Sequence, residues 1–221
     1  MESWLEDWDQ TALAAETVAA LPAEPFLFPE ERPVFEALKA ERRRREWYAG
    51  RRAARRALAS FGYDGPILPD AEGAPQVGAK LGVSLSHGPR RAVALAWRGA
   101  DRLGIDLVDG PEGPRVRRVM ERWCKPQERA LMTRGPDWAP GLLWGAREAV
   151  AKASRTGMFA YALGQVWVTE LQEDGAELNL SGVELRWTRR DGELWVAARM
   201  PTELAFELRA QAERPRSVYE S

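Results

Sequence analysis

The chain has 221 residues, which is enough for one large domain or two small ones, and its composition is ordinary for a soluble globular protein. Its 32 Lys and Arg residues nearly balance its 33 Asp and Glu residues, so the net charge predicts neither a nucleic-acid nor a membrane partner. The single cysteine, Cys124, excludes an internal disulfide framework, and the single histidine, His87, argues against a classical zinc site. The acidic N-terminus lacks a signal-peptide pattern, and no apolar run comes near the roughly eighteen residues of a membrane span, so we expect a cytoplasmic protein.

The first half of the chain begins with an acidic stretch rich in Trp and Pro, residues 1–34, where only a short strand or helix near Trp4 to Trp8 is predicted. Helical periodicity runs from Phe35 to Phe61, although Gly50 weakens its continuity. Residues 41–56 of this helix carry eight arginines. Residues 62–81 predict a loop, and strands are expected at residues 83–86, 92–97 and 103–108.

The second half repeats this order of elements. Residues 115–131 predict a helix that breaks near Cys124 and restarts at Pro126, and a second helix covers residues 142–154. Strands are expected at residues 165–171, 183–190 and 193–200, with Asp191-Gly192 as a hairpin turn, and residues 211–221 are expected to fray. The pattern therefore predicts an α+β protein with halves at residues 1–102 and 103–221, and a faint echo between residues 51–57 and 147–153 agrees with this division.

The helix at residues 142–154 has two different faces. Glu148 and Lys152 are four residues apart and share one face, with Arg147 beside them. The opposite face is an apolar line through residues 142, 143, 146, 149, 150 and 153. This pattern by itself fits an ordinary core helix that carries a solvated Glu–Lys pair.

Three motifs change that interpretation because they follow one another in a particular order. They are Ser86-His87 in a turn, Gly104-Ile105-Asp106 in a strand, and Trp144-x-x-Arg147-Glu148-x-x-x-Lys152 on a helix. Their order and spacing resemble the 4′-phosphopantetheinyl transferases, specifically the monomeric, pseudo-twofold group typified by the surfactin- and enterobactin-activating enzymes. Ala49-Gly50-Arg51, Glu72-Gly73-Ala74-Pro75 and Lys125-Pro126-Gln127-Glu128 also fall where that family has similar segments, so the resemblance covers roughly residues 40–170.

The resemblance implies a fold and a reaction. The fold would be two similar halves related by a pseudo-twofold, each a long helix packed on a small antiparallel sheet, with coenzyme A in the cleft between them. The reaction would move phosphopantetheine from coenzyme A to a serine of an acyl or peptidyl carrier protein and release 3′,5′-ADP. A magnesium ion would neutralise the pyrophosphate. A monomer is expected, with no nucleic-acid or membrane partner.

The resemblance also implies roles for individual residues. Asp106 and Glu148 match the magnesium ligands, and Glu148, or a water that it holds, would take the serine proton. Lys152 would contact the phosphates and steady the leaving group. Ser86, His87, Arg42 and Arg51 would bind phosphates of coenzyme A, a task that suits arginine because its planar fork binds phosphate with two hydrogen bonds.

The sequence departs from the family pattern at several positions. Val108 occupies the position of a third carboxylate, and Asp109 follows one residue later, which on a strand turns it to the opposite face. Arg147 replaces the usual lysine and keeps its charge. Ala74 replaces the lysine of a Gly-Lys-Pro turn, a loss for which Arg90 or Arg91 is a candidate substitute.

Alternatives to these roles remain open from the sequence. Asp106 is compatible with a strand end, His87 with an ordinary turn, Lys152 with a helix-face partner of Glu148, and the arginines with a solvated face. Trp144 is expected to pack in either case. Val108 and Ala74 also suit a degenerate relative that binds coenzyme A or a carrier without transfer, and the arginine-rich helix suits nucleic-acid binding.

A carrier-docking surface is a further expectation. It places a basic, apolar-studded face within residues 115–132, made of Arg117, Arg118, Met120 and Arg122.

Overall fold

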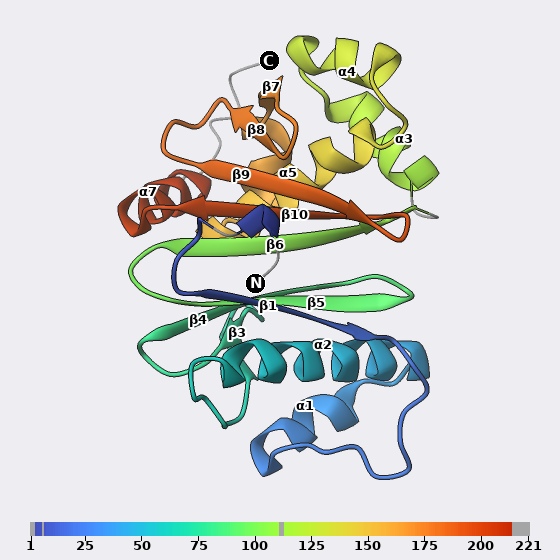
Figure 1. Cartoon of the computed structure of the whole chain (residues 1–221), viewed down its shortest axis with the longest axis vertical. Coiled ribbons are helices and arrows are strands. Elements are labelled where there is room, and N and C mark those ends of the chain that lie inside the picture. The colour runs from blue at the N-terminus through green and yellow to red at the C-terminus, as the bar shows by residue number, and fades with distance from the viewer. Residues whose placement is uncertain (1–2, 6, 111–112, 214–221) are drawn as a thin grey trace.

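The structure is a computed structural model that describes residues 3–5, 7–110 and 113–213. Four layers are stacked in it: the long helix α2 (Glu41–Ala59), a three-stranded sheet, a five-stranded sheet and the long helix α5 (Ala139–Ser154) (Figure 1). Both of these sheets are antiparallel. This arrangement confirms the predicted α+β class and the packing of a long helix on an antiparallel sheet in each half, although the second sheet is larger than expected.

The first sheet has the strand order β1–β5–β4 and is covered by α2 on one face. Its strands are β1 (Thr11–Thr17), β4 (Leu81–His87) and β5 (Arg91–Arg98). Small side chains such as Ala53 and Ala57 of α2 face Ala94 and Ala96 of β5, which lets helix and sheet approach closely. The remaining elements of this half are η1 (Ser3–Leu5), η2 (Pro29–Glu31), α1 (Arg32–Ala37), β2 (Leu68–Pro69) and β3 (Pro75–Gln76).

The second sheet has the strand order β6–β10–β9–β8–β7, and α5 packs on its outer face. Its strands are β6 (Arg102–Asp109), β7 (Val168–Leu171), β8 (Gly175–Leu178), β9 (Glu184–Arg190) and β10 (Glu193–Met200). The other elements are α3 (Gly113–Trp123), η4 (Pro126–Glu128), α4 (Arg129–Arg134), the π-helical turn η5 (Met158–Ala162), α6 (Leu163–Gln165) and α7 (Thr202–Glu213). No helix in the described ranges is long and apolar enough to cross a membrane.

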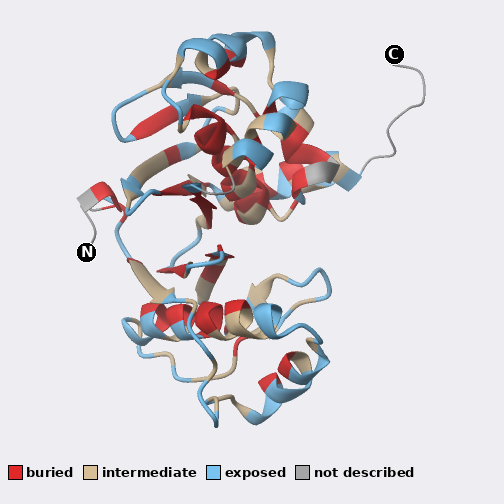
Figure 2. Ribbon diagram, turned by 90° about the vertical axis from the view of Figure 1, so that its right-hand side faces the viewer, coloured by how far each residue is buried: buried red, intermediate tan, exposed pale blue. Residues whose placement is uncertain are grey.

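The inner faces of the two sheets pack on each other through a separate apolar cluster. Leu95 of β5, Ile105 of β6 and Trp195 of β10 belong to it, and Trp4 and Trp8 from the N-terminal segment extend it over the second sheet. Figure 2 shows the resulting two lobes, with buried residues concentrated where each long helix meets its sheet. The N-terminal segment belongs to the predicted first half but packs on the second sheet. The division of the chain between residues 102 and 103 therefore stays a prediction.

Strands β4 and β6 form the edges where the two sheets meet, and serine hydroxyls join them. The Ile105 amide donates to Ser84 Oγ at 3.0 Å, and Ser86 Oγ donates to Asp106 Oδ1 at 2.8 Å. These side chains satisfy polar groups at buried strand edges that would otherwise lack partners. The same two strands hold the Ser-His and Gly-Ile-Asp motifs, so the sheet contact brings those motifs together.

Carboxylates pair with most of the arginines of α2. Arg42, Arg43, Arg45, Arg51, Arg52, Arg55 and Arg56 each form an ion pair with Glu16, Glu31, Glu41 or Glu46. Arg44 instead donates to the Leu38 carbonyl at 2.6 Å. Because eight arginines share four carboxylates, α2 and its partners keep an excess of positive charge.

Most predicted elements are present, with several corrections. The predicted helix over residues 35–61 is wrong as a single element, because Leu38 and Ala40 are extended between α1 and α2, while Gly50 does not interrupt α2. The break near Cys124, the strand at residues 103–108 and the Asp191-Gly192 hairpin are confirmed. Strands β1 and β8 and helix α7 were not predicted. Residues 211–213, which were expected to fray, belong to α7, and the rest of that segment lies outside the described residues.

Candidate functional site

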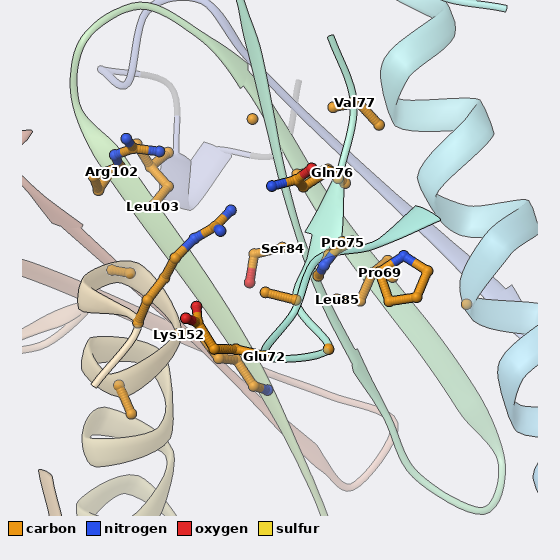
Figure 3. Close-up of a pocket in the computed structure, with 18 of the residues that line it drawn as sticks. Pro69, Glu72, Pro75, Gln76, Val77, Ser84, Leu85, Arg102, Leu103 and Lys152 are labelled. Carbon is orange, nitrogen blue, oxygen red and sulfur yellow. The ribbon is translucent and has the colours of Figure 1, made fainter. Parts of the chain in front are cut away.

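A cleft of about 1120 Å³ lies between the two halves. Its walls come from α2, the segment between residues 69 and 79, strand β4, the C-terminal end of α5 and helix α7. In Figure 3, Lys152, Arg102 and Leu103 border the same space as Pro75, Gln76 and Ser84. Of the residues predicted for the site, four line the cleft: Arg51, His87, Glu148 and Lys152.

Lys152 and Asp106 form the polar centre beside the cleft. Lys152 Nζ donates to Asp106 Oδ1 at 2.7 Å and to the Ile105 carbonyl at 2.9 Å, while Ser86 Oγ donates to the same Asp106 oxygen at 2.8 Å. Asp106 and Ser86 are buried and Lys152 is half-buried. Ser86 therefore fixes the orientation of Asp106, and it lies behind the cleft wall rather than in it.

Gly104 explains how α5 reaches β6 closely enough for this contact. A Cβ at Gly104 would lie 2.0 Å from the Ala149 carbonyl oxygen, a distance that no side chain tolerates. The glycine of the Gly-Ile-Asp motif is thus required by helix–strand packing. This close packing brings the turns of α5 that carry Glu148 and Lys152 next to the part of β6 that carries Asp106.

Glu148 lines the cleft and makes no hydrogen bond or salt bridge within the described part of the chain. Burial raises the pKa of Glu148, the nearby Asp106 carboxylate raises it further, and Lys152 opposes both effects. A partly buried carboxylate with a raised pKa is a stronger base than an exposed one.

His87 lies at the end of β4 against a buried carboxylate of α2. Its Nδ1 is 3.8 Å from Glu46 Oε2, a buried oxygen that has no hydrogen-bond partner in the part of the chain that the structure describes. Glu46 Oε1 accepts from Arg42 Nε at 2.8 Å. Burial lowers the pKa of His87, Glu46 opposes that effect, and the cations of Arg43, Lys152 and Arg42 add to it. The imidazole is therefore neutral at pH 7 in the ligand-free protein.

Arg51 is a buried cation in the wall of the cleft. Its guanidinium stacks on Trp47 at 4.5 Å, its Nε lies 4.0 Å from Glu31, and that buried Nε has no hydrogen-bond partner among the described residues. Burial lowers the pKa of Arg51 to about 10, with Glu31 opposing and Arg55 adding to that effect. A buried polar atom without a hydrogen bond is costly, so the unpaired Nε fits a site that an anion completes.

Arg42 does not line the cleft. Its side chain is 72% exposed and is held against Glu46, whereas the neighbouring Arg43 is a lining residue. Arg42 was predicted to contact a phosphate of coenzyme A, but the arginine that lines the cleft is its neighbour on the helix, Arg43.

Arg147 is not beside Glu148 and Lys152 as the spacing predicted. Its side chain is fully buried, Nη2 donates to Glu128 Oε2 at 2.6 Å, and Nη1 donates to the Leu143 carbonyl at 2.8 Å. Glu128 Oε1 in turn accepts from the Val168 amide at 3.0 Å. Arg147 thus joins α5 to η4 and β7 in the core, and its charge is not available to the cleft.

Val108 is a core residue. It packs beside Gly141 and Gly145 of α5, where an added Cβ would lie 3.4 and 3.5 Å from its methyl groups. Asp109 faces the other side of β6, as predicted, where both of its carboxylate oxygens accept from Arg90 at 3.1 and 3.2 Å. The carboxylates available at the centre are therefore Asp106 and Glu148.

Two further expectations are wrong. Arg90 and Arg91 cannot replace the missing loop lysine, because they pair with Asp109 and Asp191 outside the cleft. Met120 cannot belong to a docking surface, because its side chain is fully buried in the core of the second half.

Sequence reasoning missed several residues of the cleft. Arg43, Arg102, Arg155, Phe206 and Arg209 all line it. Arg155 and Arg209 come from the end of α5 and from α7, and the second of these helices was not predicted. Its signal is a Thr after Pro201 followed by strong helix formers, which is typical of a helix start.

Oxygen donors at the centre fit magnesium. Asp106 Oδ2 and both Glu148 oxygens make no hydrogen bond within the described ranges, and carboxylates with few other protein ligands are the usual magnesium set. In the same ranges, no three His, Cys, Asp or Glu side chains are grouped so that they could hold a metal ion. The candidate protein ligands for magnesium are therefore the carboxylates of Asp106 and Glu148.

Comparison with known proteins adds independent information. Residues 30–97 match the family model described as 4′-phosphopantetheinyl transferase N-terminal domain, and residues 102–195 match that of the 4′-phosphopantetheinyl transferase superfamily. The chain is also similar to 4′-phosphopantetheinyl transferase Svp from Streptomyces mobaraensis, with 34% identity over 135 residues, which are 58% of this chain and 54% of that protein. The chain thus spans about half the length of this curated relative.

Proposed function

Because this chain belongs to the 4′-phosphopantetheinyl transferase superfamily, we propose that it transfers 4′-phosphopantetheine from coenzyme A to a serine hydroxyl of an acyl or peptidyl carrier protein. The serine oxygen forms a bond to the phosphorus next to pantetheine, the pyrophosphate P–O bond breaks, and 3′,5′-ADP leaves. We place the chain in the monomeric, pseudo-twofold group of the family, with halves at residues 1–102 and 103–221, acting in the cytoplasm.

One observation carries this proposal. The cleft combines Arg51, a buried cation whose Nε has no hydrogen-bond partner among the described residues, with Glu148, a carboxylate that forms no hydrogen bond or salt bridge within the same ranges. The Arg51 cation suits a phosphate, and the Glu148 carboxylate suits a metal ion or a proton donor. A pyrophosphate with its cation satisfies both groups at once.

Glu148 is the proposed general base. Its raised pKa gives it more proton affinity than an exposed glutamate, and the Lys152 cation opposes that increase. It takes the serine proton directly or through a water. Asp106, held by Ser86, keeps Lys152 in place beside the cleft.

Lys152 and the cations of the first half bind the phosphates. Lys152 Nζ is fixed by Asp106 and the Ile105 carbonyl and steadies charge on the leaving 3′,5′-ADP. His87 and Arg51 line the opposite wall and donate to phosphate oxygens. Arg43, which lines the cleft, binds phosphate in place of Arg42. Magnesium bound by Asp106 and Glu148 would neutralise the pyrophosphate charge.

Replacing Arg51 with methionine should weaken coenzyme A binding without lowering stability. The change removes a charge-assisted hydrogen bond worth about 1.5–3 kcal/mol, so the Kd should rise roughly 10- to 100-fold. The unfolding midpoint should stay the same or rise, because a buried charge is removed while Glu31 keeps Arg55 and the Ile67 amide. Calorimetry and thermal unfolding measure the two effects.

Arg52→Met is the matched control for this prediction. Arg52 lies on the same helix and pairs with Glu16 outside the cleft, so coenzyme A affinity should not change. An Arg51→Met protein that binds coenzyme A as wild type does would contradict the assigned role.

A panel of carriers tests the proposed activity. The purified protein is incubated with coenzyme A, magnesium and fatty-acid, polyketide and peptide-synthetase carriers, and intact masses are recorded with and without EDTA. We expect at least one carrier to gain phosphopantetheine, and EDTA to prevent the gain. Coenzyme A binding without any mass gain would support a non-catalytic relative instead.

A further inference from the structure

Glu46 of α2 is a carboxylate buried in the wall of the cleft beside His87. Its side chain is only 2% exposed, and it lines the cleft together with His87, the last residue of β4. Arg42 Nε donates to Glu46 Oε1 at 2.8 Å, and Arg43 Nη1 lies 3.6 Å from Oε2. None of the motifs found in the sequence contains Glu46, and the proposed transfer does not use it.

One oxygen of Glu46 is left without a hydrogen bond. Among the described residues, the buried Oε2 has no hydrogen-bond partner, and His87 Nδ1 faces it at 3.8 Å. This gap exceeds the length of a hydrogen bond by less than about 1 Å, and such contacts often tighten only when a ligand binds. Because a buried carboxylate oxygen without a hydrogen bond is costly, an N–H at Nδ1 would stabilise Glu46.

A neutral imidazole cannot serve Glu46 and a phosphate at the same time. It carries a single N–H. If Nδ1 donates to Glu46, a lone pair on Nε2 faces the ligand, and if Nε2 donates to the ligand, a lone pair on Nδ1 faces the carboxylate. Either arrangement sets a lone pair against an anion. Only the imidazolium form, which has an N–H on both nitrogens, donates in both directions.

The surroundings of His87 keep its imidazole neutral until an anion binds. The charged groups that act on it are Arg42, Arg43 and Glu46 of α2 and Lys152 of α5. Burial lowers the pKa of His87, Glu46 raises it, and the three cations lower it further. An anion bound in the cleft offsets the cations, so the Glu46 carboxylate then favours the charged ring.

We propose that Glu46 is a positioning residue for His87, and that the pair takes up one proton from solvent when a phosphate-containing ligand binds. The proton forms the second N–H bond of the imidazole. Nδ1 then donates to Glu46 Oε2, while Nε2 donates to a phosphate oxygen. The inference rests on the proposed function, in which His87 binds a phosphate of coenzyme A. It adds Glu46 as the residue that sets the charge and the orientation of the ring.

Magnetic resonance of the His87 ring tests the proton uptake directly. His87 is the only histidine in the chain, so isotope-labelled histidine in protein freed of any histidine tag gives one ring to follow. Spectra are recorded at about pH 7.5 without ligand, with inorganic pyrophosphate and with coenzyme A, each with magnesium. In wild type the ring should be neutral without ligand and largely charged with either ligand. In Glu46→Gln it should stay largely neutral throughout.

Calorimetry measures the linked effect on affinity. The ligand-bound protein holds one more proton than the free protein, so binding should weaken as pH rises. Between about pH 7 and pH 8 the Kd for coenzyme A should rise up to about tenfold more in wild type than in Glu46→Gln. Protonation of coenzyme A itself is common to both proteins and cancels in this comparison.

Glu16→Gln is the matched control. Glu16 of β1 also pairs with two arginines of α2, Arg52 and Arg56, but it lies outside the cleft. Its ring charge and the pH dependence of its Kd should equal those of wild type. A structural role of Glu46 alone would lower the unfolding midpoint of Glu46→Gln without changing the charge of the bound ring. The wild-type spectra need no substitution, so they test the proton uptake even if Glu46→Gln folds poorly.

Three results would overturn the proposal: a wild-type ring that stays neutral with both ligands, a ring that is already charged without ligand, and a bound ring equally charged in Glu46→Gln. A ring that pyrophosphate alone charges would support the pair and contradict coenzyme A as its ligand. The carrier panel is read separately. Modified carriers with a neutral ring refute only the proton uptake, and a charged ring that depends on Glu46, with no modified carrier, refutes only the proposed transfer.

Discussion

Glu148→Gln should lower the rate of phosphopantetheine transfer by roughly 10²- to 10⁴-fold, the contribution typical of a general base. The amide keeps the size of the side chain but neither accepts the serine proton at neutral pH nor carries the negative charge that suits magnesium. Binding of coenzyme A through Arg51 and Lys152 should remain measurable. Initial rates from carrier mass gain, with coenzyme A saturating, measure the effect.

The same substitution should not destabilise the protein, and the pKa of Glu148 gives the reason. Burial raises this pKa, so the folded state binds the proton more tightly than the unfolded state does. The resulting stability is present below the unfolded pKa of 4.5 and is lost as pH rises through the raised folded value. At pH 7 without magnesium, Glu148→Gln should therefore unfold at the same or a higher temperature than wild type.

Glu170→Gln is the matched control for this prediction, because Glu170 is exposed on β7 and does not line the cleft. Its transfer rate should equal that of wild type. A Glu148→Gln protein with a wild-type rate would remove Glu148 from the mechanism. A protein that loses activity only because it unfolds would show a lowered midpoint.

Arg147→Met should cause the largest loss of stability, about 3–5 kcal/mol, because it leaves the Glu128 carboxylate buried without its charged partner. For a chain of this size the unfolding midpoint should fall by roughly 6–20 °C. Below that temperature the folded fraction should transfer phosphopantetheine at the wild-type rate, since Arg147 lies outside the cleft. Thermal unfolding measures the midpoint, and carrier mass gain at low temperature measures the transfer rate.

The double variant Glu128→Gln/Arg147→Met separates loss of the pair from loss of volume. Glutamine at position 128 can still accept from the Val168 amide, and no unpaired charge remains. Much of the lost stability should therefore return. If the single variant folds normally but fails to transfer, Arg147 acts in the site as the motif alone suggested, and the structural role assigned to it is wrong.

Elements with a strong local pattern could be predicted from the sequence. The Asp191-Gly192 turn has positive φ at both residues, and Pro126 begins a new helical turn. Strand β1 could not be predicted, because its alanines have little intrinsic strand preference and form a strand only by pairing with β5. The break between α1 and α2 also escaped the apolar pattern, since it depends on Arg44 binding the Leu38 carbonyl.

The relative positions of site residues could be predicted from the sequence when those residues lie on the same helix or strand. Helical spacing places Glu148 and Lys152 on one face, and strand alternation separates Asp106 from Asp109. Spacing within a helix does not reveal partners from elsewhere, such as Glu128 for Arg147, 19 residues away, or Asp70 for Arg155, 85 residues away. Arg147 was therefore assigned to the wrong environment, and the cleft arginines at the end of α5 and on α7 were missed.

Transfer to a carrier serine is the central claim, and the site-resolved mass of a carrier tests it most directly. Carrier, coenzyme A and magnesium are incubated with wild type or with Glu148→Gln, the modified residue is located by fragmentation, and released 3′,5′-ADP is quantified in the same sample. We predict phosphopantetheine on the carrier serine and an equal amount of 3′,5′-ADP with wild type, and both products formed at least about 10²-fold more slowly with Glu148→Gln. An unmodified carrier with wild type, in a preparation that a known transferase modifies, would contradict the proposed function.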